Sequence, residues 1–563
     1  MKNISNIVIG LILVAFFTVS CEDMLEVDSD QIVLPKDHQL DALNDTIYTM
    51  MGIYSQVQEL GDRYVLLGEL RGDLMDITSD ASNDIREIYN FEVSGNNKYN
   101  KASDYYSVIN SCNYLINNLD TSIIDKAEKV MYKEFSQAKA VRAWTYMQLA
   151  LNYGSVTYYD QPILSIADAN KNYPAYDLNA LAPVLIADLL PLQDVEHPGG
   201  ISLGDDMSSY KLAFNVRYLL GELYLWINEY ESAANVLYDL IDKEYTNTRL
   251  YPYDIELRVV NNEFTGGFSF SWDNIFDLES SEQITFLASA TEGEEGNTLD
   301  SLFVYYPQVQ PSSVAVENWE QQTYYHSNTL SKEKDMRGDG FSYVKEHNYV
   351  ASSLVFDPSL TENGLISKYY LTAGQIVKGV TVCRDVYIYL KYAEAVNRLG
   401  KPNLAFAVLK HGLNKKTINS DEIIPKWEKY SSYTDEEGVF YRYTDFSDEK
   451  YEEREVSLVD ETYKILAMEG VHARGCGNTE LADGYSIPEL ATLQDSINYV
   501  EDKIVEELAL ETAFEGNRFH DLMRISKHRE DNSYLADKVA EKYADKEAVK
   551  AKLLDETNWY LPK

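Results

Sequence analysis

A polar segment in the middle of the chain gathers aromatic side chains that could bind a sugar. The segment has no helical period, and its aromatic residues are Tyr305, Tyr306, Trp319, Tyr324 and Tyr325. Aromatic rings present apolar faces that can stack on the C–H surfaces of sugars, while Asn, Asp and Arg side chains reach the hydroxyl groups. Aromatic residues on helices are usually core, so these five are the first candidates for ligand contact. The alternative for each is packing against the rest of the protein.

An earlier segment could supply polar partners for such a site. Residues 71–100 are rich in Gly, Asp and Asn, which predicts a long ordered loop. Loops of that length inside a compact domain are often functional. Between Asp73 and Asn97 this loop carries Asn83, Arg86 and Tyr89. The two segments together are the candidate ligand-binding regions.

Two other groups of residues resemble catalytic or metal sites but are better explained as structural. Spacings of three and four residues predict ion pairs along one helix face for Glu511, Glu515, Arg518, Asp521 and Arg524. The second group is His472, Arg474 and Cys476, which lacks another Cys or His at zinc spacing and predicts a tight turn with a buried thiol.

No motif of a known catalytic class is present. The chain lacks G-x-S-x-G, H-E-x-x-H, a phosphate-binding glycine loop and a dinucleotide fingerprint. We therefore expect no enzyme activity, no metal and no cofactor. A glycosidase needs only two carboxylates at the right separation, so a secreted helical glycoside hydrolase stays open as an alternative.

The first 21 residues predict export and lipidation. Lys2 precedes an apolar run from Ile7 to Phe17, and Thr18-Val19-Ser20 then leads to Cys21. We expect residues 1–20 to be a signal peptide, Cys21 to carry the lipid and residues 21–40 to form a leader. The run is too short for an ordinary membrane-spanning helix. A spanning helix and a signal peptide with an incidental Cys are the alternatives.

Composition describes a large acidic globular protein. The chain has 563 residues, 45% of them hydrophobic, which provides a sizeable core. Its net charge of -42 argues against nucleic acid, whose affinity comes from neutralising phosphates. It also disfavours adhesion to an anionic membrane surface. A local basic patch could still form in the candidate loops from Arg71, Arg86, Arg337 and Lys345. The other cysteines, Cys112, Cys383 and Cys476, imply no disulfide framework.

Helical periodicity dominates the elements that must position these residues. It predicts helices over 41–60, 99–119, 126–153, 178–190 and 492–527, and a helical hairpin over 208–243. Asp177 is an expected N-cap and Gly154 an expected helix end. We expect one domain over 41–563, with a helical scaffold over about 41–244, 378–418 and 489–556. Irregular stretches are expected over about 245–377 and 419–488.

Within the scaffold, two helix pairs show the spacing of tetratricopeptide repeats. The first has Leu220, Gly221, Tyr224, Ala233 and Leu237. The second places Ala393, Ala405 and Leu409 in corresponding positions. The small residues let two antiparallel helices approach. Core positions are also predicted for three tryptophans: Trp144, Trp226 and Trp272.

These motifs together resemble the SusD/RagB family of outer-membrane nutrient-binding lipoproteins. The segments that carry the resemblance are the lipidated start, QAKAVRAWTYMQLALNYGSVTYY, the hairpin Leu212–Asp242, CRDVYIYLKYAEAVNRLG and ETAFEGNRFHDLMR. They follow the family's order and span nearly the whole chain. Where the family usually has Pro shortly after Tyr-Gly, this chain has Thr157-Tyr158-Tyr159.

The resemblance implies a mainly α-helical fold, with four tetratricopeptide-like helix pairs that support irregular excursions. It also implies a cell-surface lipoprotein that binds glycan and delivers it to a SusC-like TonB-dependent transporter in the outer membrane. RagB-like members take peptides instead, and an adhesive lipoprotein without a small ligand is a further alternative. The candidate residues match the family's binding regions by position only.

Overall fold

The protein is described here from a computed structural model. It covers residues 43–563 apart from 126–127, 199–201, 205–206, 243–254, 261–262, 269–279, 281, 289–298, 327–328, 332–334, 346–360, 370–378, 414, 430–431, 436–437, 442–469, 476–479 and 482–483. The expected signal peptide, the lipidation site Cys21, the leader, Trp272 and Cys476 lie outside the described residues.

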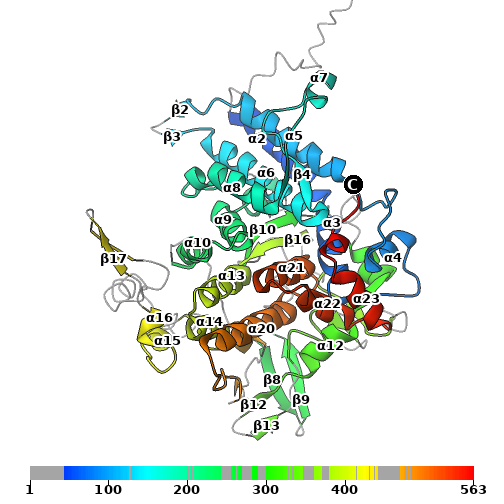
Figure 1. The fold of residues 1–563 in the computed structure, drawn as a ribbon, viewed down its shortest axis with the longest axis vertical. Helices are drawn as coiled ribbons and strands as arrows, with labels where there is room; N and C mark the ends of the chain where they lie inside the picture. Colours follow the sequence, from blue (N-terminus) through cyan, green and yellow to red (C-terminus); the bar gives the residue numbers. More distant parts are fainter. Residues whose placement is uncertain are drawn as a thin grey trace, which may run out of the picture.

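Antiparallel helices form the scaffold, as the sequence predicts (Figure 1). They stack from α2 and α5 at one end, through α6, α8, α9, α10, α13 and α14, to α20. The longer helices are α2 (Leu43–Gln58), α5 (Ala102–Asn118), α6 (Tyr132–Tyr153), α8 (Leu178–Leu189), α9 (Val216–Trp226), α10 (Tyr230–Asp242), α12 (Ser313–Glu320), α13 (Asp385–Arg398), α14 (Pro402–Lys410), α20 (Leu493–Glu511), α21 (Arg518–Arg529), α22 (Asn532–Ala540) and α23 (Lys546–Leu553).

Short helical turns connect and cover these helices. They are α3 (Gly61–Val65), η1 (Leu66–Leu70), α4 (Asn83–Tyr89), α7 (Ile166–Ala169), η2 (Leu190–Leu192), η3 (Ser209–Leu212), η4 (Ser301–Tyr305), α15 (Lys415–Ile418), α16 (Lys426–Lys429), α19 (Val471–Arg474) and η6 (Glu556–Trp559). Each of the two helix ends named above is confirmed. Asp177 accepts a hydrogen bond from the backbone of Ala180, and Gly154 ends α6 with φ 73°.

The strands are short and form separate small ladders. The pairs are β1 (Met75–Ile77) with β11 (Val309–Pro311), β2 (Ile124–Asp125) with β3 (Glu128–Lys129), β4 (Ser155–Thr157) with β5 (Ala175–Asp177), β6 (Ser202–Gly204) with β7 (Met207–Ser208), β8 (Ile255–Val260) with β9 (Glu263–Phe268), β10 (Gln283–Ala288) with β16 (Gly379–Arg384), β14 (Tyr343–Val344) with β15 (Leu365–Ile366), and β17 (Ser432–Asp435) with β18 (Gly438–Tyr441). A three-stranded sheet joins β13 (Thr329–Ser331), β12 (Tyr324–His326) and β19 (Glu480–Leu481).

Close helix packing explains the repeat pattern. A Cβ atom added to Gly221 on α9 would lie 2.7 Å from Leu237 Cδ2 on α10, so the two helices meet where the small residue was predicted. Ala393, Ala405 and Leu409 are likewise fully buried in the second pair. Trp144 and Trp226 are core residues, as expected. The predicted domain division stays a prediction.

The sequence-based element assignment is wrong in the early segment and near the C-terminus. The stretch from 71 to 100 is not a continuous loop, because it contains β1 and α4. The predicted single helix over 492–527 is two helices, α20 and α21, with a turn between them. Gly516 in this turn has φ 100°, a left-handed conformation that favours glycine.

Glu69 stabilises that turn from a distant part of the sequence. Its Oε1 accepts hydrogen bonds from the backbone N–H groups of Gly516, Asn517 and Arg518 at 2.9, 3.0 and 3.1 Å. Its Oε2 accepts one from Phe514 at 3.1 Å. These donors lie at the start of α21, where helical N–H groups lack partners within the helix. The carboxylate therefore caps α21.

This cap makes stability pH-dependent. Burial raises the pKa of Glu69 to about 7, although the backbone donors and Arg518 oppose the shift. The folded state then holds the proton more tightly than the unfolded state, so the contribution of Glu69 to stability falls as the pH rises from about 4.5 to about 7. Replacing Glu69 by Gln should remove that part of the pH dependence, about 2–3 kcal/mol. Urea unfolding of both proteins at about pH 5 and about pH 8 measures it, and an equal stability difference between them at both pH values would contradict it.

Candidate functional site

The ladder between β1 and β11 brings the two candidate regions together. Its register pairs Met75 with Pro311 and Ile77 with Val309. Just beyond it, the Thr78 backbone N–H donates to Gln308 O at 3.1 Å. The Thr78 hydroxyl donates to Pro307 O at 2.7 Å, across a separation of 229 residues in the chain. The start of the early segment therefore lies beside the end of η4, which carries the first aromatic candidates.

Exposed tyrosines and exposed polar residues meet at this junction. Tyr306 is 75% exposed and Tyr305 is 48% exposed. Beside them, Ser79, Asp80 and Asn83 are exposed. We call the surface formed by residues 79–83 and Tyr305–Tyr306 the tyrosine ledge. It combines apolar ring surface with hydroxyl, carboxylate and amide groups, which is the chemistry that sugar recognition needs.

Hydrogen bonds hold the polar half of the ledge in place. The Ser82 backbone N–H donates to Gln308 Oε1 at 2.9 Å. Arg86 Nε donates to Ala81 O at 3.0 Å, and Arg86 Nη2 donates to Ser79 O at 2.6 Å. Arg86, predicted as a ligand contact, is therefore occupied in shaping its own loop.

A third segment contacts β11, the strand that follows Tyr305 and Tyr306 in the chain, and was missed in the sequence analysis. Gln310 Oε1 accepts a hydrogen bond from the backbone N–H of Glu362 at 2.8 Å. Asn363 Nδ2 donates to Pro311 O at 3.1 Å. Glu362 is exposed. No periodicity or motif marks residues 361–363 in the sequence, so only these hydrogen bonds reveal that they are neighbours of β11.

The structure places other predicted ligand contacts in the interior. Trp319 is on helix α12, is 1% exposed, and donates its indole N–H to Leu510 O at 3.0 Å. The expectation that it lies in an irregular segment is wrong. The Tyr89 side chain is also buried, at the end of α4. Both residues lie in the protein core.

Tyr324 and Tyr325 are in strand β12, and their side chains lie outside the described residues.

The expected basic patch is wrong for two of its members, since Arg71 and Arg337 are buried. Arg71 donates to Leu67 O, Trp559 O and the Asn152 side chain. Lys345 is partly exposed, with its Nζ 3.9 Å from Glu320. Arg71 and Arg337 therefore cannot contribute to a basic surface patch.

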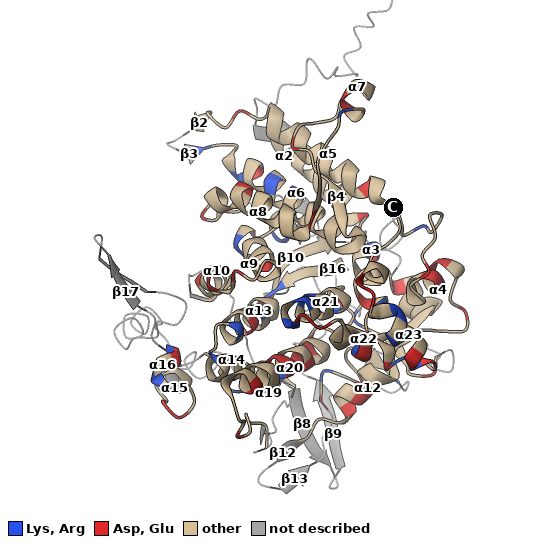
Figure 2. Ribbon diagram, in the orientation of Figure 1, with Lys and Arg blue, Asp and Glu red and all other residues tan. Residues whose placement is uncertain are grey.

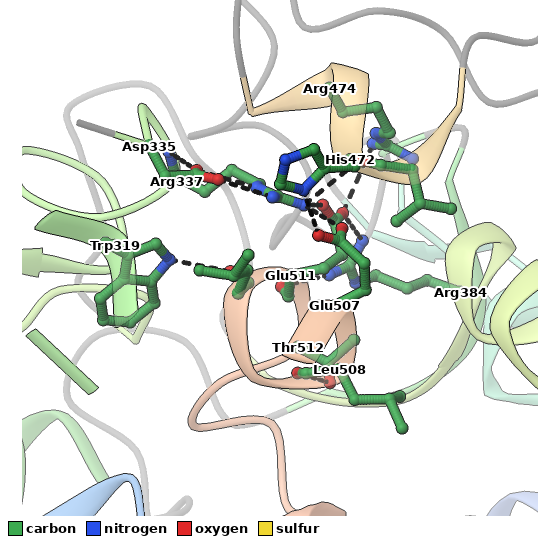
Figure 3. A network of polar contacts seen from close by, with 12 residues as sticks. Trp319, Asp335, Arg337, Arg384, His472, Arg474, Glu507, Leu508, Glu511 and Thr512 are labelled. Carbon is green, nitrogen blue, oxygen red and sulfur yellow. Dashed lines mark hydrogen bonds and ion pairs between the residues drawn. The ribbon is translucent and has the colours of Figure 1, made fainter. Parts of the chain in front are cut away.

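The residues that resemble a catalytic constellation are buried and ion-paired, and Figure 3 shows the part of their network around Glu511. Arg337 Nη1 lies 2.8 Å from Glu511 Oε2, and Arg384 Nη1 lies 2.9 Å from Glu511 Oε1. Arg384 Nε also donates to Glu515 Oε2 at 2.9 Å. His472 Nδ1 is 2.5 Å from Glu507 Oε1. Burial by itself would raise the pKa of Glu515, but Arg384 and Lys368 hold it below its ordinary value.

The prediction that these charges are structural is confirmed, but their expected partners are wrong. The sequence spacing predicted pairs along one helix, whereas most pairs join different elements. Arg518 binds Asp73 at 2.6 and 2.8 Å, and Arg524 binds Glu394 at 2.7 Å. Of the predicted members, Asp521 and Arg524 do form a pair within α21, at 2.8 Å.

The charged residues of this network lie in the middle of the fold. Figure 2 shows Lys and Arg on α13 and α21 there, and Asp and Glu on α4 and α12 at its edge.

Within the described residues no group of three or more His, Cys, Asp or Glu could hold a metal ion. Cys112 and Cys383 are free buried thiols. Nor is any helix in that part of the chain long and apolar enough to cross a membrane.

Comparison with known proteins agrees with the helical architecture. No protein-family model matches the chain. A curated relative, SusD-like protein P2 of Formosa agariphila, is 24% identical over 350 residues. That match covers 60% of this chain and 65% of the relative, so the chain spans about two thirds of the relative's length.

Solved structures match over more of the chain. A SusD superfamily protein from Bacteroides thetaiotaomicron has a TM-score of 0.54 at 16% identity, and the match covers 93% of this chain and 95% of the other. The chain has a SusD-like fold. A second structure, described as a putative sugar binding protein from Bacteroides vulgatus, has a TM-score of 0.52 at 15% identity over 87% of this chain and 88% of that one. The SusD-like fold confirms the predicted fold class, a helix-pair scaffold with few short strands.

Proposed function

We propose that this SusD-like chain is a non-catalytic, cell-surface lipoprotein that binds oligosaccharides or polysaccharides at the tyrosine ledge. It would pass them to a SusC-like TonB-dependent transporter in the outer membrane. The observation that carries the proposal is the meeting of exposed Tyr305 and Tyr306 with exposed Ser79, Asp80 and Asn83 across the β1–β11 ladder. The solved relative described as a putative sugar binding protein supports the same ligand class.

Electrostatics supports binding without turnover. The carboxylates that resemble a catalytic set, Glu511 and Glu515, are buried and paired with Arg337, Arg384 and Lys368. A general acid needs a proton to donate, whereas the Arg384 and Lys368 charges favour the ionised form of Glu515. The acidic chain, with a net charge of -42, favours neutral over acidic glycans.

Replacing both Tyr305 and Tyr306 by Ala should lower the affinity for oligosaccharide at least about tenfold, because stacking surface is lost at the centre of the contact. The purified protein is first applied to an array of neutral glycans, acidic glycans and short peptides. Titration calorimetry with the strongest binder then compares wild type and variant. Thermal unfolding should hardly change, since both side chains are exposed.

Tyr48 provides a matched control, since it is 74% exposed and lies on α2, which Figure 1 shows apart from α4. Tyr48→Ala should leave affinity unchanged. Unchanged affinity in the Tyr305/Tyr306 variant would contradict the assignment of the ledge. Binding of peptides alone on the array would instead favour the RagB-like, peptide-binding alternative.

The surface address and the transporter have a separate test. Deletion of a neighbouring SusC-like transporter should leave the lipoprotein at the cell surface but stop uptake of the bound glycan. Replacing Cys21 by Ser should remove the lipid and release the protein from the membrane fraction. Uptake that continues without the transporter would contradict the shared-transport proposal.

A further inference from the structure

The turn between α22 and α23 contacts both ends of the segment from β1 to α4, which carries residues 79–83 of the tyrosine ledge. Figure 1 shows both helices beside α4. Tyr543 in this turn donates its hydroxyl to Tyr89 O at 2.5 Å, and the rings of the two tyrosines lie 4.5 Å apart between centroids. Tyr89 is the last residue of α4. The segment from β1 to α4, which carries residues 79–83 of the ledge, is therefore hydrogen-bonded at its C-terminal end, Tyr89, to the turn between α22 and α23.

Lys542, next to Tyr543 in the chain, contacts the N-terminal end of the same segment. Lys542 is buried, and its Nζ donates to Leu70 O at 2.7 Å and to Met75 O at 2.8 Å. Met75 is the first residue of β1. The same Nζ lies 4.6 Å from the centroid of the Tyr89 ring, which adds a cation–π contact. Lys542 therefore contacts both β1 and the end of α4.

Burying the Lys542 ammonium group costs desolvation free energy. Burial lowers the pKa of Lys542 to about 7, even though Asp76, Asp73 and Glu69 favour its charged form. An apolar side chain of similar length would avoid the desolvation of the ammonium group. What the ammonium adds is a pair of directed hydrogen bonds to the carbonyl groups of Leu70 and Met75, in the stretch of chain that leads into the ledge.

A third contact extends the arrangement along the outer edge. Lys552 on α23 donates to Asn90 O at 2.9 Å, one residue beyond α4. The segment between β1 and the end of α4, which contains Ser79, Asp80 and Asn83, is thus fixed at both ends by residues from one short region of the C-terminus.

We propose that Lys542 and Tyr543 are positioning residues, which set the spacing between β1 and α4 and thereby the affinity of the tyrosine ledge for oligosaccharide. Neither residue contacts the sugar. The inference rests on the proposed function for its effect on affinity, but its effect on the loop does not depend on any ligand.

The test compares Tyr543→Phe and Lys542→Met with Tyr146→Phe in the full-length protein. Tyr146 is a matched control because its buried hydroxyl, on α6, donates to Tyr159 O at 2.7 Å in the loop after β4. Amide hydrogen exchange is followed in peptides covering residues 76–92 without ligand. Calorimetry then measures affinity for the neutral oligosaccharide that binds most strongly on the array.

In Tyr543→Phe and in Lys542→Met, amide exchange over residues 76–92 should be about fivefold faster and oligosaccharide binding about fivefold weaker. Tyr146→Phe should alter neither. If Tyr543→Phe and Lys542→Met both fold and their amide exchange rates over residues 76–92 equal those of the wild type, the positioning role is overturned. Faster exchange with unchanged affinity would overturn its link to binding. A wild-type protein that binds nothing on the array would remove the proposed function and the affinity effect, while the exchange comparison would still judge the positioning role.

Discussion

Replacing Arg384 by Ala is expected to lower the free energy of unfolding by about 3–5 kcal/mol. Arg384 is fully buried at the end of β16 and donates to Glu511 Oε1 and to both carboxylate oxygens of Glu515, at 2.9, 2.9 and 3.0 Å. Without the guanidinium, two buried carboxylates keep only part of their compensating charge. Urea unfolding monitored by circular dichroism measures the change.

A surface ion pair provides the control for this prediction. Lys546 contacts Glu541, and both side chains are more than half exposed. Lys546→Ala should change the free energy of unfolding by less than about 1 kcal/mol, because solvent screens exposed pairs. If Arg384→Ala were as mild as Lys546→Ala, the network of Figure 3 would not be the buried, coupled unit that we describe.

Trp319→Ala is expected to have an effect of similar size, a loss of about 3–5 kcal/mol. The indole packs 5.5 Å from the ring of Tyr343 and 5.9 Å from that of Phe514, measured between centroids. Its removal leaves a large cavity and deprives Leu510 O of its donor. Because Trp319 lies in the interior, the fall in stability should appear at all ligand concentrations, including none.

Trp427→Ala is the matched control, since Trp427 on α16 is 57% exposed. It should hardly alter thermal unfolding. The same pair of variants separates core from ligand contact at Trp319. An unchanged melting temperature together with lost oligosaccharide binding would restore Trp319 to the binding site and contradict its placement in the core.

The helix-pair scaffold was predictable because its signals are local. Helical periodicity, the cap at Asp177 and the end at Gly154 each depend on residues within a few positions of one another. Gly221 and Leu237 belong to consecutive helices, so their close approach also follows from one short stretch of sequence. The resemblance to the SusD/RagB family rests on the same local segments, and the solved structures confirm the fold.

The candidate site was predictable only as two regions. Composition marks Tyr305 and Tyr306 as aromatic residues in a polar segment, but the same criterion selected Trp319, which the structure buries on a helix. Composition does not say which face of α12 meets α20. That face is set by Leu510 O and the rings around Trp319, which come from elsewhere in the chain.

Contacts between distant segments set the remaining features of this protein. The turn between α20 and α21 is stabilised by Glu69, more than 440 positions earlier, which accepts hydrogen bonds from four backbone N–H groups there. The ledge exists because Thr78 meets Pro307. Local pattern describes which residues can be helical or buried, whereas the partners of a buried charge or a short strand depend on which segments the whole chain brings together as it packs.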